Sequence, residues 1–161
     1  MRRVVTIAIS IFIVGVTVQI GADSQRQSPG QSEIKRRFIG TWRLVSIESN
    51  TPNPNRGARP RGLIYYDSTG HMAVQIMPDR ARPSWTGAPT PEQAKEAITG
   101  FTAYFGTYTV DERAQTVTHH REGSLVPGPV DFVRKYEFAP GDRLILTPVD
   151  STTHLTWELI K

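Results

Sequence analysis

The sequence contains no cysteine. Disulfide bonds, a thiol nucleophile and thiolate metal ligands are therefore excluded, and the fold must rely on its hydrophobic core. The sequence also lacks the motifs that most directly signal chemistry. It has no Gly-x-Ser-x-Gly turn, no phosphate-binding glycine loop and no dinucleotide fingerprint. These absences favour a binding protein without a cofactor over the common hydrolase and nucleotide-binding classes.

An excess of charge of one sign is also lacking. Residues 23–161 hold 17 basic and 15 acidic side chains, because Arg2 and Arg3 are the only charged residues before position 23. The one group of arginines lies in a stretch rich in proline and glycine, residues 56–61. Nucleic-acid binding usually needs a clustered basic face, so nucleic acid is not an expected partner.

Only one long hydrophobic run is present, at residues 4–20, between Arg2-Arg3 and the small residues Gly21-Ala22. This pattern is typical of a secretory signal peptide, predicted here as residues 1–22, and it favours a periplasmic or secreted protein. The alternative is an uncleaved anchor, since about 17 apolar residues can span a membrane. Membrane contact would then occur only through this segment. Residues 23–37 are expected to form a flexible linker with a short helical turn at residues 33–37.

The rest of the chain, residues 38–161, shows short stretches of alternating polarity separated by turns. One helix is expected to begin at Thr90, where threonine, proline and Gln93 form a capping box, and to cover one end of the fold. Without a second helix for crossover connections, the sheet must be antiparallel. We predict an all-β, eight-stranded up-and-down barrel with one short helix, and an open sandwich is the alternative. The expected strands are residues 41–48, 63–67, 71–77, 103–110, 115–124, 130–138, 143–147 and 154–160.

Residues 50–62 cannot form regular structure, because three prolines and two glycines interrupt any strand pairing. In a barrel this segment becomes the long first loop. We expect it to lie over an open mouth.

Several stretches resemble the lipocalin-like domains of bacterial and fungal proteins, which are distant relatives of the calycins. The ordered set is more specific than its Gly-x-Trp element, Gly40 to Trp42, alone. The resemblance implies the barrel, a Gly-x-Trp plug at one end and an interior cavity, but no agreed catalytic residue. The matching stretches are residues 40–46, 62–72, 77–83, 104–110, 117–124, 134–138 and 141–144.

Alternation in phase with Trp42 identifies the side chains that should point into the barrel. Most of them are apolar, and the polar ones are the candidate ligand contacts. Among these, Arg134 needs an acceptor, because a buried charge is costly unless it is paired. That acceptor is a backbone carbonyl, a tyrosine oxygen, Glu48, or a carboxylate or carbonyl of a ligand. The alternative is that Arg134 closes the base of the barrel by stacking on Trp42. The candidate lining residues are Ser46, Tyr66, Tyr104, Tyr108, His119, Arg134 and Tyr136.

The adjacent pair His119 and His120 does not indicate a metal site. Neighbouring residues of a strand face opposite sides, so the two imidazoles cannot bind one ion together. His119 could instead act as a general acid or base. The alternative is a histidine whose hydrogen bonds are satisfied within the barrel.

Three functions remain open on these grounds. The first is an exported barrel that binds a small hydrophobic or amphipathic molecule without catalysis. The second is a cyclase- or isomerase-type enzyme, which requires Tyr108, His119 and Arg134 to converge on one void. The third is an envelope protein-interaction module with an exposed apolar face. The sequence does not identify the ligand or the oligomeric state.

Overall fold

The computed structural model describes residues 32–82 and 84–161. The predicted signal peptide, residues 1–22, and residues 23–31 of the predicted linker lie outside these residues. Within them, no helix is both long and apolar enough to cross a membrane.

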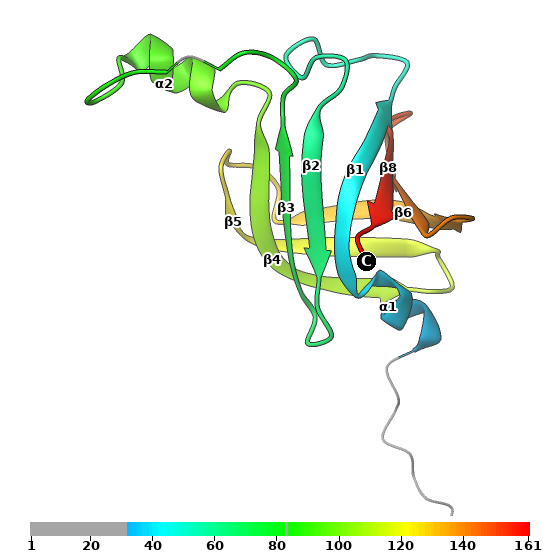
Figure 1. Ribbon diagram of the computed structural model, residues 1–161. Coiled ribbons are helices and arrows are strands. Elements are labelled where there is room, and N and C mark those ends of the chain that lie inside the picture. The colour runs from blue at the N-terminus through cyan, green and yellow to red at the C-terminus, as the bar shows by residue number, and fades with distance from the viewer. Residues whose placement is uncertain (1–31, 83) are drawn as a thin grey trace, which may run out of the picture. The chain divides into compact units, whose positions relative to one another are not determined.

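Eight strands form one closed antiparallel barrel in which each strand pairs with its neighbours in the sequence and β1 pairs with β8 (Figure 1). The pairing of β1 with β8 confirms the predicted barrel and excludes the open sandwich. Observed and predicted strand ends agree within two residues. The strands are β1 (Gly40–Glu48), β2 (Arg61–Tyr66), β3 (His71–Met77), β4 (Thr102–Asp111), β5 (Thr116–Ser124), β6 (Asp131–Ala139), β7 (Arg143–Pro148) and β8 (His154–Leu159).

The short helix α1 (Glu33–Phe38) leads into β1 and closes one end of the barrel. Ser32 caps it by accepting a hydrogen bond from the Lys35 backbone N–H. Residues 33–37 therefore form the expected helical turn and not part of a flexible linker. The helix ends at Phe38, whose side chain is fully buried in the core of the barrel.

Phe38 is the centre of an aromatic plug at this end. Its ring makes edge-to-face contacts with Tyr66, Tyr136 and Phe138, with centroids 5.4, 5.1 and 5.1 Å away. Trp42 donates its indole N–H to the Phe38 carbonyl at 2.8 Å, so its own polar group is satisfied. These rings fill the interior of the barrel at this end.

Gly40 allows the chain to turn from α1 into β1. Its φ is +142°, and a Cβ atom there would lie 2.7 Å from a methyl carbon of Leu159. Glycine readily adopts this angle, which other residues rarely do, and a side chain here would also displace the end of Leu159. Together with Trp42, Gly40 thus has the structural place that the Gly-x-Trp pattern predicts.

The helix α2 (Pro91–Ile98) lies at the opposite end of the barrel (Figure 1). The predicted capping box is present, with Thr90 and Gln93 exchanging hydrogen bonds. The expectation that this helix covers the barrel is wrong, because none of its residues is buried. Two arginines of the preceding loop fix the position of the helix. Arg80 donates to the Glu96 and Thr99 carbonyls, and Arg82 donates to the Ala97 carbonyl.

Replacing Phe38 with alanine tests the plug. The variant removes a fully buried ring from the centre of four aromatic neighbours, so the free energy of unfolding in urea should fall by about 3–5 kcal/mol. Phe105→Ala is the matched control, because that ring is 56% exposed on the outer wall, and its loss should cost about 1 kcal/mol or less. Equal effects of the two substitutions would contradict the plug.

Candidate functional site

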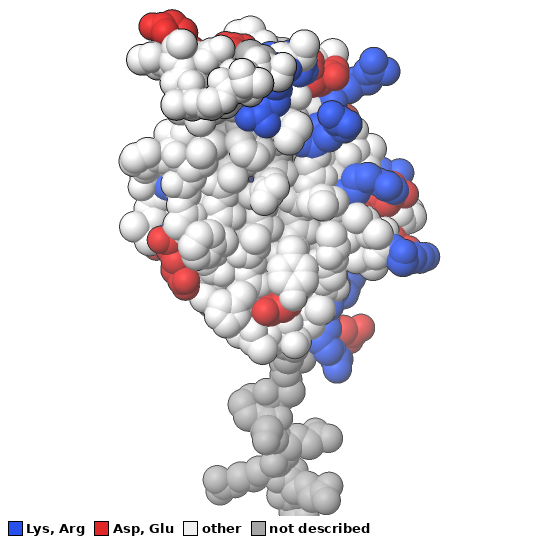
Figure 2. Space-filling model, turned by 60° about the vertical axis from the view of Figure 1, so that its left-hand side comes forward, with Lys and Arg blue, Asp and Glu red and all other residues white. Residues whose placement is uncertain are grey.

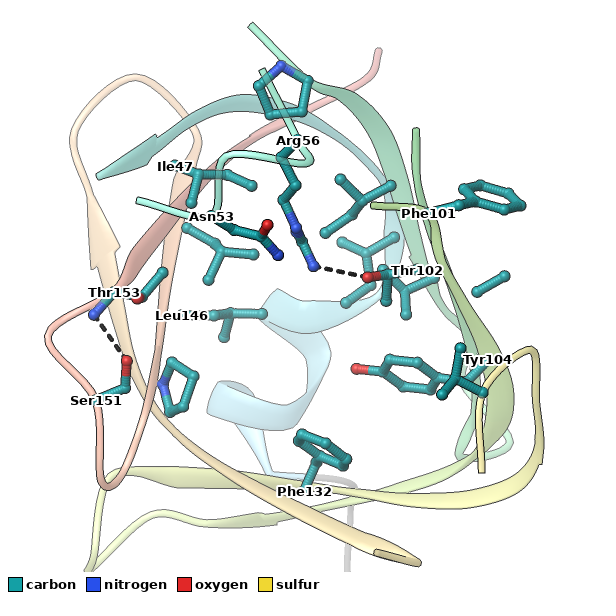
Figure 3. Close-up of a pocket in the computed structure, with 18 of the residues that line it drawn as sticks. Ile47, Asn53, Arg56, Phe101, Thr102, Tyr104, Phe132, Leu146, Ser151 and Thr153 are labelled. Atoms are coloured by element: carbon teal, nitrogen blue, oxygen red, sulfur yellow. Dashed lines mark hydrogen bonds between the residues drawn. The ribbon is translucent and has the colours of Figure 1, made fainter. Parts of the chain in front are cut away.

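The end of the barrel opposite α1 contains a cavity of about 500 Å³, a volume within the usual range for small-molecule sites. Its wall is mainly apolar. Figure 3 shows side chains from the wall and from the loops above converging on this space. The apolar wall is formed by Ile47, Ile64, Val74, Ile76, Phe132, Leu146, Leu155 and Trp157.

The mouth of the cavity is bordered by two loops. One is the proline-rich first loop, which contributes Thr51 to Asn53, Arg56, Gly57 and Pro60, so it lies over the mouth as predicted. The other connects β5 to β6 and contributes residues 125–129. The cavity therefore opens between two loops that carry five prolines.

The first loop is fixed in place at Gly57 and Arg56. Gly57 has φ +76°, and a Cβ atom there would lie 2.4 Å from the Asp79 carbonyl oxygen, so only glycine permits this close approach. Asp79 donates its backbone N–H to the Arg56 carbonyl at 2.7 Å. The Arg56 side chain then points into the cavity and donates to Thr102 Oγ1 at 2.7 Å (Figure 3). Burial lowers the pKa of this guanidinium from its ordinary value.

A β-bulge changes which residues of β1 face inward. Leu44 pairs with Trp157 of β8, but Ser46 pairs with the next residue, Thr156, so Val45 is left without a partner. Alternation is shifted by one residue from this point. Ile47 lines the cavity, and Ser46 hydrogen-bonds Glu48 on an exposed site. The expectation that Ser46 lines the barrel is therefore wrong.

His119 lies under the cavity floor, fully buried between two tyrosines. Tyr66 Oη is 2.7 Å from Nε2 of the imidazole, and Tyr104 Oη is 2.8 Å from Nδ1. Burial, with smaller effects of Arg134 and His120, lowers the pKa of His119 well below its ordinary value. The ring is therefore neutral, with one donor and one acceptor nitrogen.

The burial of Tyr66 decides which nitrogen carries the proton. Its hydroxyl has 0% exposure, and among the described residues His119 is its only partner, so the hydroxyl must donate to Nε2 to avoid an unsatisfied buried donor. His119 then carries its proton on Nδ1 and donates it to Tyr104. As a result the Tyr104 hydroxyl keeps its own hydrogen free for an acceptor in the cavity. Burial raises the pKa of both tyrosines, so they stay protonated.

Arg134 lines the cavity from β6. Its guanidinium lies over the Phe132 ring, 5.0 Å from the centroid. The predicted alternative, stacking on Trp42, is not observed. Arg37 of α1 supplies the cation at the plugged end instead, 4.0 Å from the centroid of Phe138, which in turn contacts Trp42.

Three buried side-chain nitrogens in the described part of the chain have no hydrogen-bond partner: Nε of Arg121, Nη1 of Arg134 and Nε1 of Trp157. All three are donors, and all three residues line the cavity. Buried donors without partners are rare in native proteins. Their concentration around one cavity indicates a place for acceptor atoms.

The cavity also has an excess of positive charge. Arg56, Arg121 and Arg134 line it, whereas no aspartate or glutamate of residues 32–82 and 84–161 does so. None of the three arginines forms a salt bridge with a described residue. Arg121 lies 4.4 Å from the Phe132 centroid and donates to the Pro129 carbonyl. The described residues thus provide no carboxylate that compensates the charge of the cavity.

The predicted lining residues separate into three groups. Tyr104 and Arg134 line the cavity, and Tyr66 and His119 form the layer directly beneath it. Tyr108 and Tyr136 belong to the plugged end, where both pack on Phe38. Tyr108 donates to the Asp67 carbonyl at 2.9 Å, and burial, with a smaller effect of Asp67, raises its pKa to about 12.

This separation contradicts the condition for the enzyme hypothesis. Tyr108, His119 and Arg134 do not meet at one void, because only Arg134 lines the cavity and both nitrogens of His119 already have partners. In the described residues no three side chains are grouped in a way that could hold a metal ion. The geometry supplies hydrogen-bond donors and three guanidinium cations to the cavity.

Sequence reasoning missed the cavity residues Arg121, Ile47 and Arg56, and it missed the unpartnered N–H of Trp157. Arg121 follows Val117 and His119 in the same alternation, so extending that pattern by one step would have found it. Trp157 was expected to face inward, but its unpartnered N–H has no sequence signal. Ile47 was hidden by the bulge, and Arg56 by the irregular loop that carries it.

These features define a class of protein, an up-and-down barrel that is plugged at one end and contains a ligand-sized cavity at the other. The sequence agrees: residues 39–158 match the lipocalin-like domain family, and the chain belongs to that family. A solved structure with some similarity is the 1.00 Å crystal structure of a DUF4847 family protein from Bacteroides vulgatus ATCC 8482. It is 12% identical, the match covers 78% of this chain and 96% of that one, and the TM-score is 0.43. No curated protein matches the chain.

The protonation of His119 should make stability depend on pH. The unfolded chain binds a proton at this residue below its ordinary pKa of 6.5, whereas the folded chain does so only at a much lower pH, so acid favours unfolding. Between pH 7.5 and 5.5 this residue should lower the free energy of unfolding by about 1.4 kcal/mol. In His119→Gln that contribution should disappear.

Urea unfolding at the two pH values measures the effect. His154→Gln, which removes a histidine from the surface instead of the core, is the matched substitution. The same pH dependence in wild type and His119→Gln would show that His119 is not buried as a neutral ring.

Proposed function

We propose that the protein binds a small, mostly apolar molecule in the barrel cavity and does not transform it. The cavity itself carries the proposal, because it has a ligand-sized volume, a mainly apolar wall and a mouth between two loops. Membership of the lipocalin-like family supports the same reading. We propose no catalysis because both nitrogens of His119 are hydrogen-bonded to tyrosines beneath the cavity floor.

We propose further that the protein acts outside the cytoplasm, in the periplasm or after secretion. This part of the proposal rests only on the charge and hydrophobicity of residues 1–22. The absence of cysteine is compatible with it, because a barrel with this core needs no disulfide bond.

The outer wall offers a second candidate function, the docking of another protein. Leu63, Tyr65 and Phe105 are 48, 45 and 56% exposed on β2 and β4. Figure 2 shows a broad stretch of wall with few charged side chains. Exposed apolar patches mark interaction sites in many soluble proteins. Gln75, which pairs with Leu63 in the barrel wall, lies on this face.

A titration with N-phenyl-1-naphthylamine, an uncharged probe that fluoresces in apolar surroundings, tests the cavity proposal. Wild type should bind one equivalent with enhanced fluorescence. Val74→Trp places an indole inside the cavity, so it should abolish binding or weaken it at least about tenfold. Gln75→Trp adds the same ring one residue further along β3, on the outer wall, and should leave binding unchanged.

The pattern of the two variants separates the candidate sites. Loss of binding in Gln75→Trp but not in Val74→Trp would move the probe to the outer face and favour the docking function. No binding to folded wild type would contradict the cavity proposal.

A further inference from the structure

We propose that the ligand is an amphipathic carboxylate whose charged group is held at the cavity floor by Arg134 while its apolar part extends toward the mouth. This inference rests on the proposed function, since it specifies the chemistry of the molecule in the same cavity. Four observations about the described residues carry it.

The first observation is the position of Arg134. Its Nη1 is buried and has no partner among the described residues, and its charge is not paired with any of their carboxylates. A guanidinium is always charged in proteins and presents several N–H groups in one plane. Burial of such a group without an acceptor is unfavourable. An anionic oxygen in the cavity would remove this penalty.

The second observation is that two neutral donors share the need for an acceptor. Trp157 is 1% exposed and its indole N–H has no partner in the described chain. The Tyr104 hydroxyl keeps a free hydrogen because His119 donates to its oxygen. The Tyr104 hydroxyl points toward the middle of the cavity in Figure 3. A carboxylate accepts up to about four hydrogen bonds, so it suits a cavity that offers donors only.

The third observation is the balance of charge. Three arginines and no carboxylate of the described chain line the cavity, so a neutral ligand would leave all three charges uncompensated. Burial also lowers the pKa of Arg56, because removing the charged guanidinium from water is unfavourable. A bound anion reduces this cost, whereas a cationic ligand would increase it.

The fourth observation sets the orientation. Tyr104 is only 7% exposed, and it contacts the buried His119, so the donors near it lie deep in the cavity. The mouth is rich in apolar surface, from Pro52, Pro60, Leu125, Val126 and Pro127. The arginines beside it already donate to protein acceptors, Arg56 to Thr102 and Arg121 to the Pro129 carbonyl. The charged group therefore belongs at the floor and the hydrocarbon part at the mouth.

Displacement of bound N-phenyl-1-naphthylamine by decanoate and by decan-1-ol tests the inference, because the two molecules share a ten-carbon chain and differ in the head group. Wild type should prefer decanoate by at least about tenfold, the range that a charge-assisted hydrogen bond supports. Arg134→Met, which keeps the length of the side chain, should remove this preference and retain probe binding.

Lys135→Met is the matched control. It removes the same charge one residue along β6, from an exposed side chain, and should keep the preference for decanoate. Arg134→Lys, which keeps the positive charge, should keep part of it and provides a second test if the methionine variant does not fold.

Equal displacement by decanoate and decan-1-ol in wild type would overturn the inference, and so would an unchanged preference in a folded Arg134→Met. In both cases the probe still binds, so the cavity proposal stands. Failure of the probe to bind wild type would remove the proposed function and the inference with it.

Discussion

The hydrogen bonds of His119 to Tyr66 and Tyr104 are the constraint on which the structure of the barrel interior depends. A buried imidazole must be neutral and must have both nitrogens satisfied, and two tyrosines from β2 and β4 meet that requirement. This layer separates two different halves of the barrel. On one side Phe38 and the rings around it fill the space. On the other side the lumen is hollow.

The same layer determines the polarity of the hollow half. Because the Tyr66 hydroxyl is buried, it donates its hydrogen bond to His119, and His119 in turn donates to Tyr104. The O–H of Tyr104 is therefore free to donate into the cavity. Arg134 and Trp157 add donors that lack partners among the described residues. The barrel thus offers an apolar wall and a donor-rich floor. This combination suits a molecule with an apolar body and one anionic end.

Most of the fold could be predicted because its signals are local. Alternating polarity marked the strands, and the phase of Trp42 carried over to Tyr66, Tyr104 and His119. The site was less predictable because it depends on events that leave no local signal. The bulge at Val45 exchanges the sides of the barrel wall that Ser46 and Ile47 face. Arg56 reaches the cavity because the contact between Gly57 and Asp79 fixes its loop. The pairing of Arg37 with Phe138, which frees Arg134 from the plug, depends on how α1 docks.

A crystal structure of the protein grown with decanoate tests the central claim most directly, because it images the ligand and the donors together. The account predicts electron density for decanoate inside the barrel, with its carboxylate within hydrogen-bonding distance of Arg134 Nη1 and its chain directed to the loops at the mouth. A barrel filled by its own side chains at this end would contradict the account. Decanoate bound with its carboxylate at the mouth, away from Arg134, would contradict it equally.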